Sequence, residues 1–147
     1  MPRLDRLWKS VIEEFFPHFL EYFFENHFHL IDLEKGFKFM DKELHAISKN
    51  SKDDIRIPDV LAKIHLKGGH ELGILIHVEV QGYVDKNFAE RMYIQQYRIK
   101  ERFKLPTAAI AIFTDDSPSF HPKIYESNIF GTSIPVSYTH LTLPTKA

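Results

Sequence analysis

Apolar and polar positions alternate with a period of two between residues 57 and 81. On both sides of a glycine pair, the even positions are mostly apolar: Val60, Ala62, Ile64, Leu66, Leu72, Ile74, Ile76, Val78 and Val80. The odd positions hold nearly all of the polar side chains: Asp59, Lys63, His65, His77, Glu79 and Gln81. A period of two is typical of β-strands, so this stretch predicts a β-hairpin with one buried face and one wetter face.

The register of the predicted hairpin follows from the same alternation. Because both strands bury even positions, the numbers of two paired residues must add up to an even number. A tight turn at the glycine pair fails this condition, whereas a loop from Lys67 to Glu71 pairs Leu66 with Leu72 and meets it. This register sets Asp59 opposite Glu79, with Cβ atoms about 5 Å apart. Two carboxylates that close repel each other, so we expect a divalent cation such as Mg²⁺ between them.

Three further segments have helical periodicity. Residues 4–24 place apolar side chains on one side of a helix that Pro17 breaks or kinks, and their many aromatic rings are expected to pack on the sheet or on a partner chain. Residues 37–48 predict a short helix. Residues 86–103 predict an amphipathic helix with Asp85 as its N-cap and one apolar stripe: Phe88, Met92, Ile99 and Phe103.

The last part of the chain predicts a buried strand and a tail. Residues 107–114 form a continuous apolar run, and a strand that follows a helix in this way is expected to lie parallel to a strand of the hairpin. Residues 125–134 are expected to supply another short element. Residues 137–147 have neither helical nor convincing strand periodicity and look like translated adapter sequence. We therefore expect residues 1–136 to form one domain, truncated at its C-terminal side, and residues 137–147 to be a non-native tail.

Composition narrows the class of protein. A chain of 147 residues is long enough for one domain with a core, and its net charge of −1 means that nucleic-acid binding would have to come from a local basic patch. The absence of cysteine excludes disulfides, thiolate metal sites and cysteine nucleophiles. No signal peptide and no apolar run long enough to span a bilayer is visible, so we expect a cytoplasmic protein with no membrane partner.

The candidate chemistry lies on the polar face of the hairpin. Glu79 and Gln81 are two residues apart on one strand and so share a face, and the register puts Asp59 across from them. Two carboxylates and a third polar group on rigid strands suit a metal-dependent phosphodiester hydrolase. The alternative is that these are ordinary polar residues on the exposed side of a hairpin. His77 faces Leu61 and is expected to be a packed strand histidine, with DNA contact or proton relay as the other interpretation.

Basic residues of the predicted helix 86–103 form a second candidate feature. Arg91, Arg98 and Arg102 share one stripe at spacings of seven and four. One interpretation is a solvated face that Glu90 and Glu101 partly neutralise, and the other is a ridge that contacts phosphates.

Several segments resemble one nuclease superfamily. PDVLAKIHL, ILIHVEVQGYVDKNFAERMYIQQYRI and AIAIFTDD are similar to the PD-(D/E)XK nucleases, and within them to the Rpn family of recombination-promoting nucleases and transposases. LWKSVIEEFF and FKFMDKEL resemble the N-terminal helices of the same family. The resemblance extends from about Leu4 to Pro135, and its most specific piece is HVEVQGYVDKNFAERM.

The resemblance implies a fold and a set of site residues. The implied fold is an α/β domain with an α-β-β-β-α-β core, in which a mixed sheet is flanked by helices, here with extra N-terminal helices. Asp59 takes the position of the first motif acid, Glu79 that of the second, and both would bind the metal. Gln81 stands where the superfamily has its signature lysine, and Glu43 matches an acid that some members add to the metal site. Lys63 and Lys86 are candidates for the missing cation, and Lys86 is the better placed of the two.

The implied function is cleavage of DNA. We expect an Mg²⁺-dependent DNA endonuclease, with Mn²⁺ as an alternative ion, associated with recombination or transposition. Its partners would be DNA, contacted by Arg91, Arg98, Arg102 and Lys86, and a second copy of the chain in a homodimer. Because an amide supplies no positive charge, a DNA-binding or interaction module with the same fold and no reaction is the first alternative. A non-functional fragment is the second.

Overall fold

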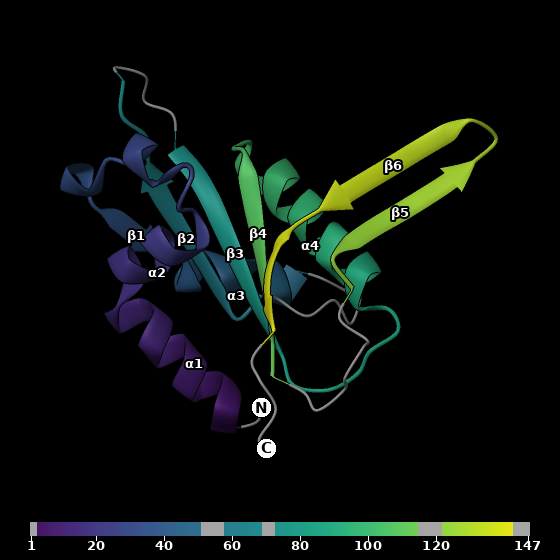
Figure 1. The fold of residues 1–147 in the computed structure, drawn as a ribbon, viewed down its shortest axis with the longest axis horizontal. Helices are drawn as coiled ribbons and strands as arrows, with labels where there is room; N and C mark the ends of the chain where they lie inside the picture. Colours follow the sequence, from purple (N-terminus) through teal and green to yellow (C-terminus); the bar gives the residue numbers. More distant parts are fainter. Residues whose placement is uncertain (1–2, 51–57, 69–72, 115–121, 143–147) are drawn as a thin grey trace.

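The computed structural model describes residues 3–50, 58–68, 73–114 and 122–142, and Figure 1 shows their arrangement. The fold is mixed α/β, with a five-stranded mixed sheet flanked by helices and a separate two-stranded hairpin. The helices are α1 (Arg3–Glu14), α2 (Phe16–Phe23), α3 (Asp41–Asn50) and α4 (Phe88–Phe103), with 3₁₀ turns η1 (Phe28–Leu30) and η2 (Leu33–Lys35). The strands are β1 (Phe37–Phe39), β2 (Val60–His65), β3 (Gly73–Gln81), β4 (Thr107–Phe113), β5 (Ile124–Ile129), β6 (Thr132–Ser137) and β7 (Thr139–Thr142).

The sheet joins an antiparallel half to a parallel half. Its strand order is β1-β2-β3-β4-β7, with β1, β2 and β3 antiparallel in turn. β4 is parallel to β3, and β7 is parallel to β4. The crossover from β3 to β4 runs through α4, as the sequence predicts. β4 is a strand buried on both faces, since its residues from Ala109 to Phe113 are all buried.

The predicted hairpin register is confirmed. Val60 pairs with Val78 and Ile64 with Ile74, so paired numbers add up to the even value that the alternation requires. One step beyond Val60, the same register sets residue 59 opposite residue 79. Residues 69–72 lie outside the described residues, so the predicted pairing of Leu66 with Leu72 is not visible directly.

The even face of the sheet packs on the N-terminal helices (Figure 1). Its buried cluster joins α1 and α2 to the strands through Ile12, Phe16, Leu20, Val60, Ala62, Ile64, Ile76, Val78, Val80, Ile110 and Ile112. The helix breaks at Phe15, and Pro17 lies in the first turn of α2, where its missing N–H leaves no helical bond unmade. The predicted break at Pro17 is therefore confirmed.

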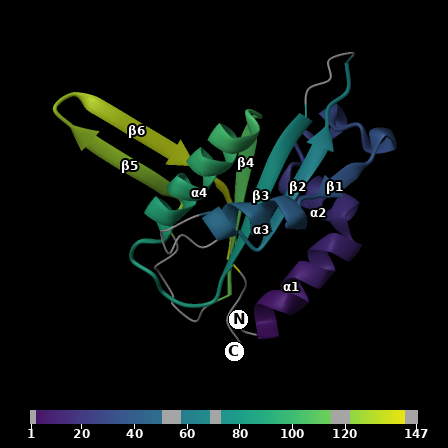
Figure 2. The same ribbon diagram turned by 180° about the vertical axis from the view of Figure 1, so that it is seen from behind.

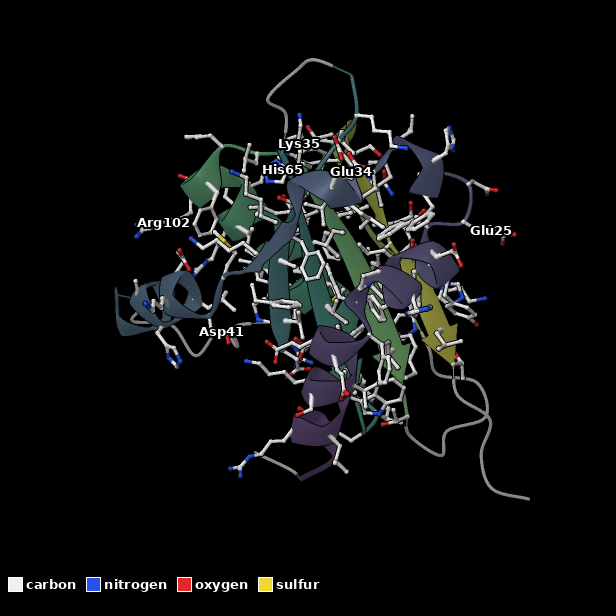
Figure 3. All side chains as sticks on the ribbon, turned by 90° about the vertical axis from the view of Figure 1, so that its left-hand side faces the viewer. Glu25, Glu34, Lys35, Asp41, His65 and Arg102 are labelled. Atoms are coloured by element: carbon white, nitrogen blue, oxygen red, sulfur yellow. The ribbon has the colours of Figure 1, made fainter. Side chains whose placement is uncertain are left out.

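The apolar stripe predicted for the first helix is only partly buried. Ile12 is 1 % exposed, but Leu7, Val11 and Phe15 are each about half exposed, at 56 %, 48 % and 51 %. The predicted apolar stripe was too wide. The sheet covers the side of the helix that bears Ile12, but it does not also cover the adjacent side that bears residues 7, 11 and 15. α1 is also tied to α3 by an ion pair of 3.3 Å between Lys9 and Asp41, which is labelled in Figure 3.

The prediction of a wetter odd face is wrong. Leu61, Leu75 and His77 are fully buried, and Glu79 and Gln81 are each only 1 % exposed. Figure 2 shows the reason, because α3 and α4 lie on this face of the sheet. Two apolar clusters join these helices to it: Met40, Leu44, Leu61, Leu75 and Ile99, and then Phe88, Met92, Ala109, Ala111, Phe113 and Tyr138.

Two predicted element boundaries need correction. Residues 37–39 form β1, which pairs with β2 from Ala62 to Ile64, and only from Asp41 does the chain become helical. The alternation of Phe37, Lys38 and Phe39 was too short to be recognised as a strand. α4 begins at Phe88, with Asn87 in the N-cap position, while Asp85 instead accepts a hydrogen bond from the backbone N–H of Asn87.

The C-terminal part that the structure describes, residues 122–142, contains three strands. β5 and β6 form a hairpin that projects from the sheet in Figure 1, so the short element expected at residues 125–134 is confirmed. Residues 139–142 of the predicted tail form β7, which pairs with β4, although their sequence shows no convincing strand periodicity. Tyr138 is 8 % exposed, packs against Phe88 and donates a hydrogen bond from its hydroxyl to the carbonyl of Pro122.

Candidate functional site

The site lies where β2 begins and β3 continues beyond its pairing with β2. Asp59 precedes β2, and its Oδ2 accepts a hydrogen bond of 2.7 Å from the backbone N–H of Val80. Val80 lies past the last paired residue of β2, so the Asp59 carboxylate replaces the strand partner that this N–H would otherwise lack. The bond holds the carboxylate of Asp59 against the backbone that joins Glu79 to Val80.

Glu79 presents its carboxylate from the buried odd face of β3. It is 1 % exposed, and its neighbour on β4 is the buried Ala111. Burial of a carboxylate is costly unless hydrogen bonds or positive charge compensate for it. The structure therefore brings Asp59 and Glu79 to the same strand end, as the register predicts.

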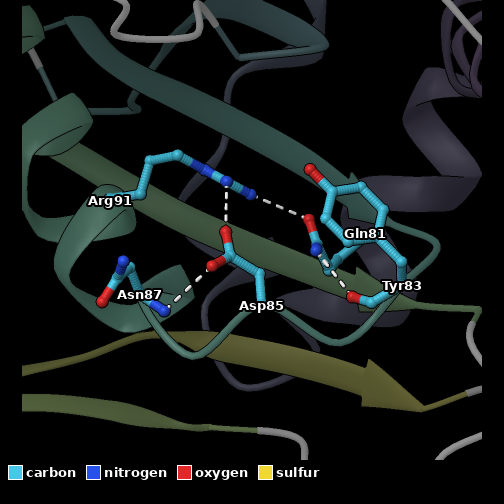
Figure 4. A network of polar contacts seen from close by, with 5 residues as sticks. All are labelled: Gln81, Tyr83, Asp85, Asn87 and Arg91. Atoms are coloured by element: carbon cyan, nitrogen blue, oxygen red, sulfur yellow. Dashed lines mark hydrogen bonds and ion pairs between the residues drawn. The ribbon is translucent and has the colours of Figure 1, made fainter.

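Gln81 lies in a polar network at the C-terminal end of β3 (Figure 4). Its Nε2 donates to the carbonyl of Tyr83 at 2.7 Å, and its Oε1 accepts from Nη2 of Arg91 at 2.8 Å. Arg91 also forms an ion pair with Asp85 through Nη1. Asp85 in turn accepts a bond of 2.9 Å from the backbone N–H of Asn87, which fixes the connector between β3 and α4.

The network fixes the orientation of the Gln81 amide. A guanidinium group has only donors and a backbone carbonyl has only acceptors, so the amide oxygen must face Arg91 and the amide nitrogen must face Tyr83. Gln81 is itself 1 % exposed. Its side chain therefore acts here as a rigid bridge between the strand end and the first turn of α4.

Arg91 is a buried cation in this network. Its side chain is 18 % exposed, and its guanidinium carbon lies 5.4 Å from the centre of the Phe88 ring. Among the described residues, no acceptor lies within hydrogen-bond distance of Arg91 Nε. This shielded Nε atom is the one nitrogen of the Arg91 guanidinium for which the described residues provide no acceptor.

The other predicted DNA contacts lie apart from this network. Arg98 is half-buried, and Arg102 and Lys86 are exposed. Arg102 extends outward near the end of α4 in Figure 3. The three arginines predicted to form one stripe therefore differ in their surroundings. Arg91 bonds to Gln81 at the end of β3, whereas Arg98 and Arg102 lie outside this network.

Glu43 lies in the first turn of α3. It forms an ion pair of 3.1 Å with Lys38. The pKa of Glu43 is lowered, mainly by a hydrogen bond from the backbone and secondly by the hydrogen bond from the Lys38 ammonium. Within residues 3–50, 58–68, 73–114 and 122–142, no group of three or more histidines, aspartates and glutamates is close enough to hold a metal ion. Lys63 pairs with Leu75, several residues before Gln81 on β3.

His77 is a packed strand histidine. It pairs with Leu61, is fully buried and has no hydrogen bond to either ring nitrogen within the described part of the chain. Burial lowers the pKa of His77 to about 4, so the ring is neutral near pH 7. Sequence analysis also missed Gln95, a polar residue of α4 that is 2 % exposed.

A separate cavity lies on the opposite face of the sheet. It has a volume of about 560 Å³ and lies between α2 and the even positions of the strands, where Ile64, Ile74, Ile76 and Ala108 contribute to its lining. Glu79 and Gln81 are at odd positions, so this cavity does not belong to the carboxylate site.

Comparisons of the chain with protein-family models, with curated proteins and with solved structures find no match. The likeness to the PD-(D/E)XK nucleases therefore remains a prediction from the sequence motifs. None of the helices in the described residues combines the length and the apolar character that crossing a membrane requires.

Proposed function

We propose that this protein is a metal-dependent DNA endonuclease with a PD-(D/E)XK-like core. The observation that carries the proposal is the bond from Val80 N–H to Asp59, which holds one carboxylate beside the strand residue that bears the other, Glu79. The element order α2, β1, β2, β3, α4, β4 also supports it, since this is the expected core order with α3 inserted between two strands.

The donor set suits a magnesium ion. Asp59 Oδ1 and the Glu79 carboxylate offer oxygen atoms, which Mg²⁺ prefers, and Mg²⁺ sites commonly use one or two carboxylates together with substrate phosphate and water. A bound divalent ion would supply a Lewis acid that polarises the phosphate and lowers the pKa of the attacking water. Glu43 has no part in this proposal, because it is paired with Lys38.

The reaction is hydrolysis of one phosphodiester bond. A water oxygen forms a bond to phosphorus while the bond from phosphorus to the leaving sugar oxygen breaks. The water releases one proton to solvent, and the sugar oxygen takes one up, so the products are a phosphate monoester and a hydroxyl group. Lys86, Arg98 and Arg102 of the α4 region would contact the phosphates that flank the cleaved one.

Nicking of supercoiled plasmid DNA tests this function. The wild-type chain is expected to nick in Mg²⁺ and not in EDTA. Asp59→Asn keeps an acceptor for Val80 N–H but removes the charge, and Glu79→Gln keeps the size of the side chain. Both are expected to lower the rate by at least about 10²-fold, the usual scale for loss of a transition-state contact. The exposed Glu90→Gln on α4 is the matched control and should nick at the wild-type rate. Mg²⁺-dependent nicking that survives both site substitutions would rule out this assignment.

One observation favours a second candidate, a DNA-binding module without a reaction. The Gln81 amide is bonded on both sides and carries no charge, so position 81 supplies neither a cation nor an unengaged amide for the reaction. This candidate predicts binding of DNA with no cleavage in Mg²⁺ or Mn²⁺ and no effect of Asp59→Asn on the affinity.

A further inference from the structure

A positive charge beside the scissile phosphate is the part of the proposed site that the strand residues do not supply. Lys63 lies too far back on β2, and Lys86 is exposed in the connector. His77 is fully buried beside Leu61 within the sheet. Arg91 is the cation that the described structure holds next to Gln81.

Arg91 is held in place from three sides. Gln81 accepts from Nη2, Asp85 pairs with Nη1, and the Phe88 ring lies against the guanidinium plane. These contacts leave Nε as a donor with no acceptor among the described residues. Nε is itself shielded from solvent, so a phosphate oxygen would be bound by the second N–H of an Nη group, and an anionic oxygen is a strong acceptor for such an N–H.

The Gln81 side chain explains why the arginine can lie here. An ammonium group at position 81 would lie against the guanidinium and repel it, whereas the amide oxygen of Gln81 accepts from Arg91. Gln81 thus orients the guanidinium of Arg91, which is the cation that α4 provides at this site.

We propose that Arg91 binds a non-bridging oxygen of the scissile DNA phosphate and offsets its negative charge, with Gln81 and Asp85 as positioning residues. The inference rests on the proposed function for the cleavage step, and it assigns to Arg91 a role different from general contact with the DNA backbone. A planar guanidinium with a fixed orientation is suited to phosphate oxygens.

The competing explanation is that Arg91 only holds the connector through Asp85. The double substitution Arg91→Met/Asp85→Asn distinguishes the two explanations. Arg91→Met alone leaves the Asp85 carboxylate without its ion-pair partner, and the added Asp85→Asn removes that charge. Nicking rate, DNA affinity in EDTA and the urea unfolding midpoint are measured for wild type, Arg91→Met, the double variant and the control Arg6→Met, which changes an exposed arginine of α1.

The expected result is a fall in nicking rate of about 10²–10³-fold for Arg91→Met, the scale reported for one transition-state donor, with no recovery in the double variant. Gln81→Lys added to Arg91→Met is expected to restore at least about a tenth of the rate, since it returns a cation to the strand end. Wild-type nicking by Arg91→Met, or recovery in the double variant, would overturn the proposal while leaving the nuclease function standing.

The affinity measurement separates this inference from the nuclease function. If the wild-type chain does not nick at all, the proposed function fails, and Arg91 is then judged by binding of duplex DNA in EDTA. A weaker affinity for Arg91→Met, with a salt slope smaller by about 1, is the effect of one lost phosphate contact and supports the proposal. Affinity equal to that of Arg6→Met overturns it.

A folding defect in Arg91→Met would make Arg91→Lys the deciding variant. Lysine keeps the charge and the ion pair with Asp85 but loses the fork of donors. Its affinity for DNA is expected to stay within about twofold of wild type while its nicking rate falls about tenfold, since only the oriented contact is lost. A wild-type nicking rate for Arg91→Lys overturns the proposal.

Discussion

At the scale of single residues, Asp59 has two tasks that one carboxylate can perform together. Its Oδ2 completes the hydrogen bonding of the β3 backbone at Val80, and its Oδ1 is the atom proposed to bind the cation. This is why Asp59→Asn is a better probe than Asp59→Ala. The asparagine amide can still accept from Val80 N–H, whereas alanine would leave that N–H without its partner and lower stability.

His77 illustrates a buried polar residue that the site does not use. Both ring nitrogens lack a hydrogen bond among the described residues, and the ring lies between Leu61 and Ala109 in the sheet. His77→Leu is expected to raise the free energy of unfolding by about 1 kcal/mol, because it removes two unsatisfied polar atoms from the core. Urea unfolding at pH 7.5 in EDTA measures this.

The control for His77 is an exposed histidine of α3. His45→Leu should change the free energy of unfolding by less than about 0.5 kcal/mol, the usual range for surface positions. A His77→Leu protein that is less stable than wild type, or one that folds normally and no longer nicks DNA, would show that the ring has a partner or a catalytic role.

The sequence predicts some site residues better than others for a physical reason. The opposition of Asp59 and Glu79 follows from the parity of the two strands together with the length of the loop that joins them, and a period of two specifies the parity. The contact between Gln81 and Arg91 depends on the path of the connector from residue 82 to residue 87, and no periodicity describes that path. Arg91 was accordingly grouped with Arg98 and Arg102 by helical spacing alone.

At the scale of elements, the burial of the β2-β3 hairpin agrees with the prediction on one face and differs from it on the other. Alternation identified the even face correctly, but the odd face is also covered, by α3 and α4. The available signal was the presence of Leu61 and Leu75 at odd positions, which a strand with one wet face has no reason to carry. A crossover helix must return over one face of its sheet, so a buried odd face could have been expected.

The β5-β6 hairpin carries an unfavourable turn residue. Ile129 pairs with Thr132, so Phe130 and Gly131 form a two-residue turn, and Phe130 has a φ of 48° while its side chain is fully exposed. Asparagine adopts this left-handed conformation more readily than phenylalanine. Phe130→Asn is expected to stabilise the hairpin by roughly 0.5–1 kcal/mol.

Amide hydrogen exchange measures this change locally, since a two-stranded hairpin can open without the rest of the fold. Exchange of the β5 and β6 amides is expected to slow by about two- to fivefold in Phe130→Asn, the equivalent of that free energy. Phe130→Ala is the matched control, because it removes the same ring without favouring the turn. Equal exchange in the two variants would contradict the role assigned to the turn.

At the scale of the whole molecule, the two faces of the sheet differ in the residues that they bury. The even face packs on α1 and α2 and lines the apolar cavity, while the odd face packs on α3 and α4 and carries the buried Glu79 and Gln81. The net charge of −1 gives no general attraction to DNA, so binding would depend on the basic residues of the α4 region. The mixed sheet with flanking helices was predictable from periodicity, whereas β1 and β7 are too short for a period to identify.

Asp59 and Glu79 are proposed to hold one divalent cation together, and calorimetric titration with Mn²⁺ and Mg²⁺ measures this binding. We expect an ion to bind to the wild-type chain and to Glu90→Gln. We also expect affinity weaker by at least about tenfold in Asp59→Asn and in Glu79→Gln, since loss of even an outer partner of a metal site has that effect. No binding by the wild-type chain, or equal binding by all four proteins, would contradict the proposed cation site.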